Sequence, residues 1–357
     1  MAKQTGPSLS EVTQLGRQVV KIVVAGLVLM MVGRMVWGAF SAYWQSINPP
    51  PPPPPTVGFG ILPSQRFPEK TDLAKPASYQ LEIAAGRLPN LGDRAAVFFM
   101  PQSTLGLFAD QDAQELAARY NFVFEPERLS ARLYRWRRSS PLESTFQLDI
   151  QTRQLRFTTN YLNRPDLLVD SRPPERFEAE QIVKAFLRTG NLLAEDLADS
   201  TSRTTYLRLA GTELVEAVSY TDADFVEVNL NRAPIDDFYE IYTPDGLNAV
   251  VRAIVGGAFS GNSNVYQLTY NYQEIDYLSV HTYPLRTTAD AWNLLKAGEG
   301  FLADFDGGET AVIREVVLGY YDDFEEQQFL MPVYVFLGDD DFIGYVPAIA
   351  PAFVTPN

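Results

Sequence analysis

The sequence predicts an α+β protein with an N-terminal transmembrane helix, a polyproline linker and repeated modules that each pack one helix on an antiparallel sheet. Three observations lead to this prediction. An apolar run from Ile22 to Trp44 precedes an unbroken proline run, Pro49–Pro55. The remaining chain mixes alternating stretches, typical of strands, with single helical stretches. Cysteine is absent from the 357 residues, so stability must come from buried apolar side chains rather than disulfides.

The apolar run predicts a transmembrane helix over residues 19–45. At about 1.5 Å per residue, the segment from Ile22 to Trp44 is about 35 Å long, enough to cross a bilayer core of about 30 Å. Trp37 and Trp44 suit an interfacial aromatic belt, while Arg34 inside the span costs about 3 kcal/mol. The alternative is a signal peptide cleaved near Ser41. Apolar residues on both sides of Arg34 favour a retained anchor.

Charge at the N-terminal flank predicts the orientation. Residues 1–18 should form a cytoplasmic tail, because basic residues near a span stay on the cytoplasmic side. The chain carries a net charge of −15, and Glu11 is the only one of its 44 acidic residues that precedes Pro49. The segment after Pro49 is therefore external and acidic, and it should repel nucleic acid. The basic residues of the flank are Lys3, Arg17 and Lys21.

Composition and pattern divide the external part into a linker and three units. Residues 46–75 form a proline-rich linker, in which the seven consecutive prolines predict a polyproline II rod of about 22 Å. An α+β unit is expected in each of the ranges 76–142, 143–260 and 261–357. The third unit should be related to the second, because Ala185–Glu195 and Leu294–Asp304 share a helix end, a glycine, and an apolar pair before alanine and an acid.

Each unit is expected to contain one helix. The predicted helices cover 110–120, 177–187 and 288–297, with Asn121, Gly190 and Gly298 at their ends and Thr287 and Thr288 capping the third. Trp292, Leu295 and Phe301 should be buried in the last unit. The predicted strands are 94–100 and 129–137 in the first unit; paired strands within 145–161, then 204–209, 214–220 and 225–230 in the second; and 265–272, 277–283, 311–321, 331–337 and 342–349 in the third.

Four stretches of the last unit carry a family resemblance: Thr288–Trp292, Val317–Tyr321, Pro332–Phe336 and Tyr345–Ile349. With the preceding anchor, this part of the chain resembles the PepSY-like modules and the YycH/YycI type of bacterial envelope regulators. Such modules are non-enzymatic and dock on other envelope proteins, including sensor kinases or peptidases. The resemblance implies an interaction role, with no catalytic residue and no cofactor to carry over.

Motifs for catalysis or metal binding are weak. His281 is the only histidine and lies in an alternating stretch, so we expect a strand residue rather than a base. Gly257–Gly261 lacks the spacing of a nucleophile elbow and is predicted to be a loop. Asp304–Glu309 has only part of a calcium-loop pattern, and Asp339–Asp341 suits a polar turn. A solvated hairpin is expected around Asp322, Asp323, Glu325 and Glu326, and no metal site is predicted.

One basic and aromatic cluster stands out in the acidic body. Alternation places Arg132, Tyr134, Trp136 and Arg138 on one face of a strand. Arginine and aromatic residues are typical of interface hot spots, so these four are the candidate binding residues. The alternative is that the rings belong to the core and the arginines pair with the protein's own acids.

The function expected from these observations is a membrane-anchored extracytoplasmic binding or regulatory module without enzymatic activity. Its predicted partner is another envelope protein or peptide, and its location is the cell membrane, with a single span. Two other classes stay open. One is a membrane-tethered cell-wall hydrolase with a carboxylate pair, since a glycosidase needs only two suitably separated carboxylates. The other is a structural subunit of a surface or secretion assembly.

Overall fold

The computed structural model describes residues 9–47, 53–71, 73–164, 166, 172–200, 202–246, 249–260 and 263–356. Contacts divide the chain into two compact units, 1–54 and 55–357. The first eight residues of the predicted cytoplasmic tail and most of the predicted polyproline rod lie outside the described residues.

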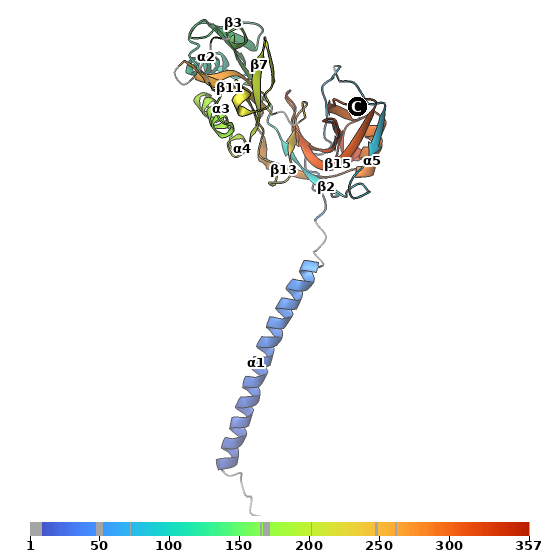
Figure 1. Ribbon diagram of the computed structural model, residues 1–357. Helices are drawn as coiled ribbons and strands as arrows, with labels where there is room; N and C mark the ends of the chain where they lie inside the picture. The colour runs from blue at the N-terminus through green and yellow to red at the C-terminus, as the bar shows by residue number, and fades with distance from the viewer. Residues whose placement is uncertain are drawn as a thin grey trace, which may run out of the picture. The chain divides into compact units, whose positions relative to one another are not determined.

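The first unit contains one long helix, α1 (Leu9–Ile47), of 39 residues (Figure 1). It includes the whole of the predicted helix 19–45. Its apolar side chains are exposed: Leu29, Met35 and Trp37 each keep more than two thirds of their surface accessible. In the described part of the chain, no helix reaches the combination of length and apolarity that a membrane span requires.

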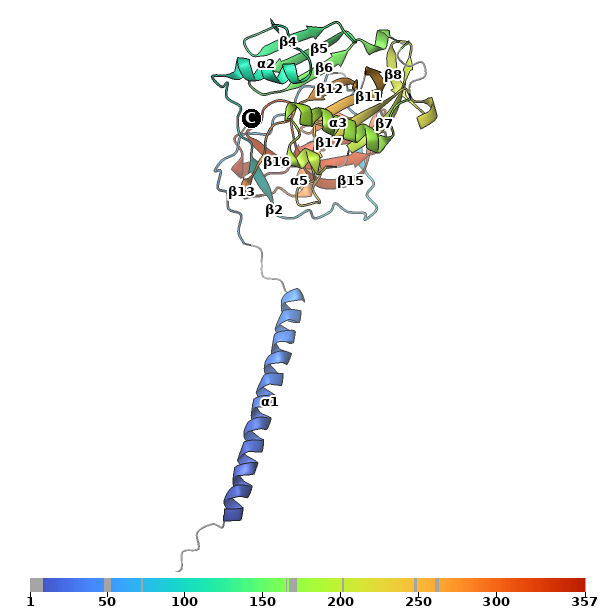
Figure 2. The ribbon, with the colours of Figure 1, turned by 90° about the vertical axis from the view of Figure 1, so that its left-hand side faces the viewer.

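In the second unit, the described residues form two sheets (Figures 1 and 2). The larger has nine strands, and every neighbouring pair in it is antiparallel. In spatial order its strands are β3 (Glu127–Arg128), β4 (Leu133–Arg138), β5 (Ser144–Asp149), β6 (Leu155–Thr159), β12 (Ser263–Tyr270), β11 (Val251–Ser260), β9 (Phe225–Leu230), β7 (Ser202–Ala210) and β8 (Glu213–Glu216).

Helices α2 (Ala109–Arg119) and α3 (Arg176–Gly190) pack on one face of this sheet (Figure 2). Their apolar stripes meet alternate strand residues in one continuous core that includes Leu116, Val183, Trp136 and Val228. Asn121 follows α2 with φ 65°, which confirms the predicted left-handed helix end. The short α4 (Glu195–Ala198) comes shortly after α3.

The second sheet has eight strands and a core on each face. Helix α5 (Thr288–Lys296) covers one face, and its own Leu295 is buried in the core there. The bounds are β1 (Ser78–Leu81), β2 (Arg94–Phe99), β10 (Ile241–Tyr242), β13 (Asp276–Pro284), β14 (Phe301–Asp304), β15 (Thr310–Tyr321), β16 (Phe329–Gly338) and β17 (Ile343–Pro347). Strands β1 and β10 pair with β15 in parallel, while the other pairs are antiparallel.

Local signals define α5 as predicted. The Thr287 side chain accepts a hydrogen bond from the backbone N–H of Asp290, which satisfies one of the free donors of the first turn. Gly298 takes φ +78° just after the helix, as expected for a glycine stop. Leu295 and Phe301 are buried as predicted, whereas Trp292 is only partly buried, between Tyr79 and Phe336.

The strands do not sort into sheets by the predicted ranges. Range 76–142 contributes β1 and β2 to the eight-stranded sheet but α2, β3 and β4 to the nine-stranded sheet. Strand β12, predicted in the third unit, joins β6 to β11 in the nine-stranded sheet. The predicted loop at Gly257–Gly261 is wrong for its described part, because β11 continues to Ser260. Close packing of Gly256 on Tyr266 and Phe225 explains a glycine within that strand.

The end of the predicted linker 46–75 packs on the eight-stranded sheet. Leu62 is fully buried, and its N–H donates to the carbonyl of Phe353. Phe67 stacks on Phe301 with ring centroids 5.0 Å apart. The segment after the prolines therefore belongs to the core of the second unit.

Candidate functional site

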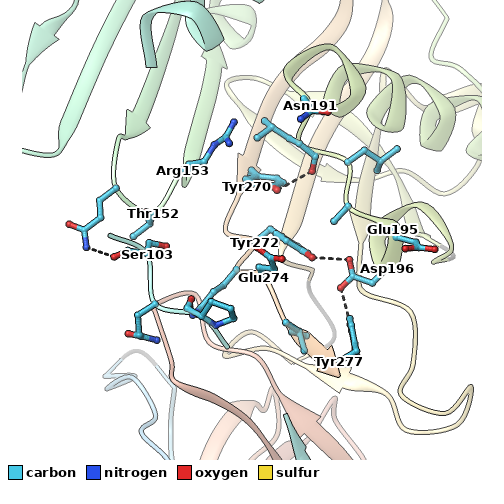
Figure 3. Close-up of a pocket in the computed structure, with 18 of the residues that line it drawn as sticks. Ser103, Thr152, Arg153, Asn191, Glu195, Asp196, Tyr270, Tyr272, Glu274 and Tyr277 are labelled. Atoms are coloured by element: carbon cyan, nitrogen blue, oxygen red, sulfur yellow. Dashed lines mark hydrogen bonds between the residues drawn. The ribbon is translucent and has the colours of Figure 1, made fainter. Parts of the chain in front are cut away.

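The second unit contains a cleft of about 760 Å³, within the usual size range of ligand sites (Figure 3). Turns and strand ends from both sheets form its walls. The residues that carry its chemistry are Ser103, Arg153, Glu195, Asp196, Asp199, Tyr270, Tyr272, Glu274 and Tyr277.

We call this cavity the tyrosine cleft, after its lining residues Tyr270, Tyr272 and Tyr277. Asp196 holds one of its walls in place. Its Oδ1 accepts a hydrogen bond from the Tyr272 hydroxyl at 3.1 Å, and its Oδ2 accepts from the Tyr277 hydroxyl at 3.0 Å (Figure 3). Nη1 of Arg232 also lies 2.7 Å from Oδ2. Both carboxylate oxygens are thus occupied, and the rings of Tyr272 and Tyr277 are held in fixed positions along the cleft.

Arg232 lies behind this wall and connects it to the other sheet. Its side chain is fully buried, with Nε 2.6 Å from Oδ2 of Asp322, whose side chain is also fully buried. The guanidinium packs 4.1 Å from the centre of the Tyr272 ring, and Nη2 donates to the carbonyl of Gln273. Burial opposes its charge, but Asp322 and Asp196 outweigh burial and hold the pKa of Arg232 above its ordinary value.

The tyrosines of the cleft remain protonated over a wide pH range. Burial raises the pKa of Tyr270, Tyr272 and Tyr277 above the ordinary value, and the nearby Asp196 carboxylate adds to the effect. Each hydroxyl therefore serves as a hydrogen-bond donor. Tyr270 donates to the carbonyl of Leu192, beneath the cleft surface.

Arg153 supplies the positive charge of the cleft. It lies at the β5–β6 turn with φ 61°, a left-handed conformation that favours glycine or asparagine. The turn is built by Asp149, whose Oδ1 accepts from the N–H groups of Gln151 and Thr152. In Figure 3, Arg153 lies across the cavity from Asp196. Among the described lining residues, Arg153 is the one with a positively charged side chain.

The candidate binding residues lie outside the cleft, and for Tyr134 and Trp136 the structure agrees with the alternative that the rings belong to the core. Tyr134, Trp136 and Arg138 share one face of β4, which packs against α2, whereas Arg132 precedes β4, is exposed and pairs with Asp149. Tyr134 and Trp136 are buried, and the Tyr134 hydroxyl donates to Asp110 at 2.6 Å. The rings therefore belong to the core.

The acidic hairpin prediction is wrong at Asp322, which is buried against Arg232. The Asp339–Asp341 turn is confirmed, since Asp340 and Asp341 both have positive φ between β16 and β17. His281 lies in β13 as predicted and contacts Phe59 edge to face. Within the described ranges, no group of three histidine or acidic residues is placed to hold a metal ion.

Sequence reasoning did not identify the tyrosine cleft. A local signal was present, because Tyr270, Tyr272 and Tyr277 lie within eight residues of one another at the junction of two predicted strands. This local signal did not include the residues that hold the tyrosines, because Asp196 and Arg232 come from distant segments.

No protein family model matches the chain, and no curated protein matches it. Among solved structures, the chain is similar to an uncharacterised protein from Eubacterium rectale ATCC 33656. The two are 11% identical, the match covers 71% of this chain and 82% of the other, and the TM-score is 0.33. A likeness this distant carries no argument about function.

Proposed function

We propose that the protein is an extracytoplasmic binding module of the cell envelope, held at the membrane through α1, and that the tyrosine cleft receives a peptide segment of another envelope protein. The observation that carries this proposal is the arrangement around Asp196. Two tyrosine rings are fixed by hydrogen bonds along an open cleft, with Arg153 opposite. Tyrosines held in this way offer contact area and hydrogen-bond donors at little entropic cost.

The rival function, a hydrolase with two carboxylates, fits the cleft less well. Asp196 is the shielded carboxylate of the lining, with a side chain 9% exposed, and three donors already occupy it. An acid-base catalyst needs a carboxyl group that is free to exchange a proton with substrate. Glu195, Asp199 and Glu274 are exposed at the rim. These positions suit attraction of basic groups in a ligand.

Membrane attachment through α1 rests on its exposed apolar side chains and on the basic flank that precedes them. Side chains such as Leu29 and Met35 need a non-aqueous surrounding, which lipid provides. We also propose that the modules of the second unit are PepSY-like and YycH/YycI-like.

Site-specific photocrosslinking in native membranes tests the proposal. A benzophenone side chain in place of Tyr277, which is 41% exposed, should capture one defined envelope protein. The same group in place of Val218, which is 96% exposed outside the cleft, should not capture it. The captured protein is then made as overlapping peptides, and we expect one peptide to bind the purified full-length chain.

Arg153→Gly provides a matched variant for that experiment. Glycine adopts the left-handed conformation freely, so the turn should survive while the guanidinium is lost. Capture through position 277 should fall. Asp340→Gly, at another left-handed position, should leave capture unchanged. Release of soluble fragments from purified cell wall by the wild-type protein would instead favour the hydrolase.

A further inference from the structure

A second cavity lies between α2 and α3, on the helix face of the nine-stranded sheet. Its volume is about 480 Å³, and it shares no lining residue with the tyrosine cleft. Its floor includes Phe157 of β6 and Val265 of β12, the two strands that join the halves of the sheet. The main lining residues are Arg119, Tyr120, Arg138, Phe157, Ile182 and Phe186.

The walls of this interhelical slot are aromatic and fixed in place. The Tyr120 hydroxyl donates to the carbonyl of Phe186 at 2.9 Å, and the two rings stack with centroids 4.5 Å apart. Phe186 also contacts Phe157 at 5.6 Å. A ligand would therefore meet preformed aromatic surfaces, which favours planar apolar groups.

Arg138 brings an uncompensated positive charge to the slot. Arg132, Arg135 and Arg137 each lie near a carboxylate, whereas Arg138 has no such partner among the described residues. Nη1 of Arg138 donates to the Tyr120 carbonyl at 3.1 Å, and the guanidinium lies 4.8 Å from the centre of the Phe122 ring.

Two further observations bear on the charge of the slot. Burial lowers the pKa of Arg138 from its ordinary value, and no nearby acid offsets that cost. Nε of Arg138 is buried without a hydrogen-bond partner among the described atoms. Glu178, an exposed residue, is the single carboxylate in the described lining, and Arg119 adds a second cation. An anion beside the Arg138 guanidinium would gain a charge-assisted hydrogen bond in an otherwise acidic protein.

We propose that the interhelical slot binds a small aromatic monocarboxylate, with its carboxylate at Arg138 and its ring among Tyr120, Phe157 and Phe186. The planar guanidinium suits a carboxylate, and the rings supply the apolar contact. This site is separate from the tyrosine cleft and does not depend on its function.

Calorimetric titration of the full-length chain with 2-naphthoate tests the proposal, with neutral 2-naphthylmethanol as the matched probe. We expect saturable binding of 2-naphthoate and binding at least about tenfold weaker for the alcohol, as the loss of a charged hydrogen bond implies. Arg138→Gln should weaken 2-naphthoate to the level of the alcohol. Arg132→Gln, which changes an arginine outside the slot lining, should leave both unchanged.

Ala185→Trp keeps the test decisive if Arg138→Gln fails to fold. Ala185 is exposed and lines the slot, so a larger side chain there should fill the slot without disturbing the core. This variant should lose binding of both probes while its circular dichroism spectrum and melting temperature stay unchanged. Equal affinity for the two probes, undiminished 2-naphthoate binding by Ala185→Trp or folded Arg138→Gln, or no saturable binding by the wild-type chain would overturn the proposal.

Discussion

Arg232 and Asp322 are 90 residues apart in the chain, yet Nε of one lies 2.6 Å from Oδ2 of the other, with both side chains fully buried. Arg232 follows β9 of the nine-stranded sheet, and Asp322 follows β15 of the eight-stranded sheet. The ion pair therefore connects the two sheets directly. Because Arg232 also binds Asp196, the same side chain supports the wall of the tyrosine cleft.

Removal of Asp322 should destabilise the protein strongly. Asp322→Ala leaves the buried Arg232 with one carboxylate instead of two, and breaking a buried pair commonly costs about 3 to 5 kcal/mol. Chemical denaturation followed by circular dichroism measures the loss. Asp339→Ala, which breaks an exposed pair with Arg314, is the control and should change little. Equal effects of the two variants would contradict a special role for the buried pair.

Gly190→Ala should destabilise the contact between α2 and α3. A methyl group at position 190 would collide with the Tyr120 hydroxyl and press on Leu116, although alanine is the better helix former. We expect a net loss of about 1 to 3 kcal/mol, as for other overpacked sites. In a Tyr120→Phe background the hydroxyl is gone, so the same change should cost less. Thermal unfolding of the four proteins measures this coupling, and simple additivity would argue against it.

Stability should fall at alkaline pH through the tyrosines of the cleft. The pKa values of Tyr270, Tyr272 and Tyr277 are raised above the unfolded value of 10.0. Below pH 10 their contribution is complete, and it is lost as pH rises through the folded pKa values, because the unfolded chain releases these protons first. Tyrosinate absorbance should show residues that ionise only with unfolding. Tyr272→Phe should reduce that late fraction, and ionisation of every tyrosine near pH 10 in the folded protein would contradict the prediction.

Trp292→Ala should lower the stability of the second unit. The ring contacts Tyr79 of β1 and Phe336 of β16, so its removal weakens the packing of α5 against these two strands. Since Trp292 is only partly buried, we expect the low end of the usual cost, about 3 kcal/mol. Differential scanning calorimetry of the full-length chain measures the shift. An unchanged melting temperature would mean that this ring does not contribute to the core.

Protease treatment tests the predicted topology. Protease added to intact spheroplasts should degrade residues 55–357 and leave a tag at the N-terminus intact, since the basic flank is expected in the cytoplasm. Lysed spheroplasts serve as the control, in which the tag should also be lost. Protection of the second unit in intact spheroplasts would reverse the orientation.

Local signals in the sequence predicted local structure well. Thr287 and Gly298 bound α5, Asn121 ends α2 in the left-handed conformation, and the alternation in β4 places Tyr134 and Trp136 on one face. What lies against that face depends on distant segments, so composition alone left both a partner protein and the protein's own core open. The same limit applies to Asp322. Its acidic neighbours predicted a solvent-exposed side chain, but in the fold it is buried against the distant Arg232. The tyrosine cleft combines segments from both sheets, so the local sequence shows its tyrosines but not the residues that face them.

The pairing of β1 with β15 has a consequence for how the protein folds. The hydroxyls of Ser78 and Thr310 form a hydrogen bond across that pair although 232 residues separate them. Strand β2 likewise pairs with the distant β13. During synthesis, which begins at the N-terminus, the first strands must therefore stay unpaired until nearly the whole sequence has been made. Such long-range pairing slows folding and leaves strand edges open to aggregation in the meantime. Truncation before β15 should consequently leave β1 without its partner strand and prevent the eight-stranded sheet from forming.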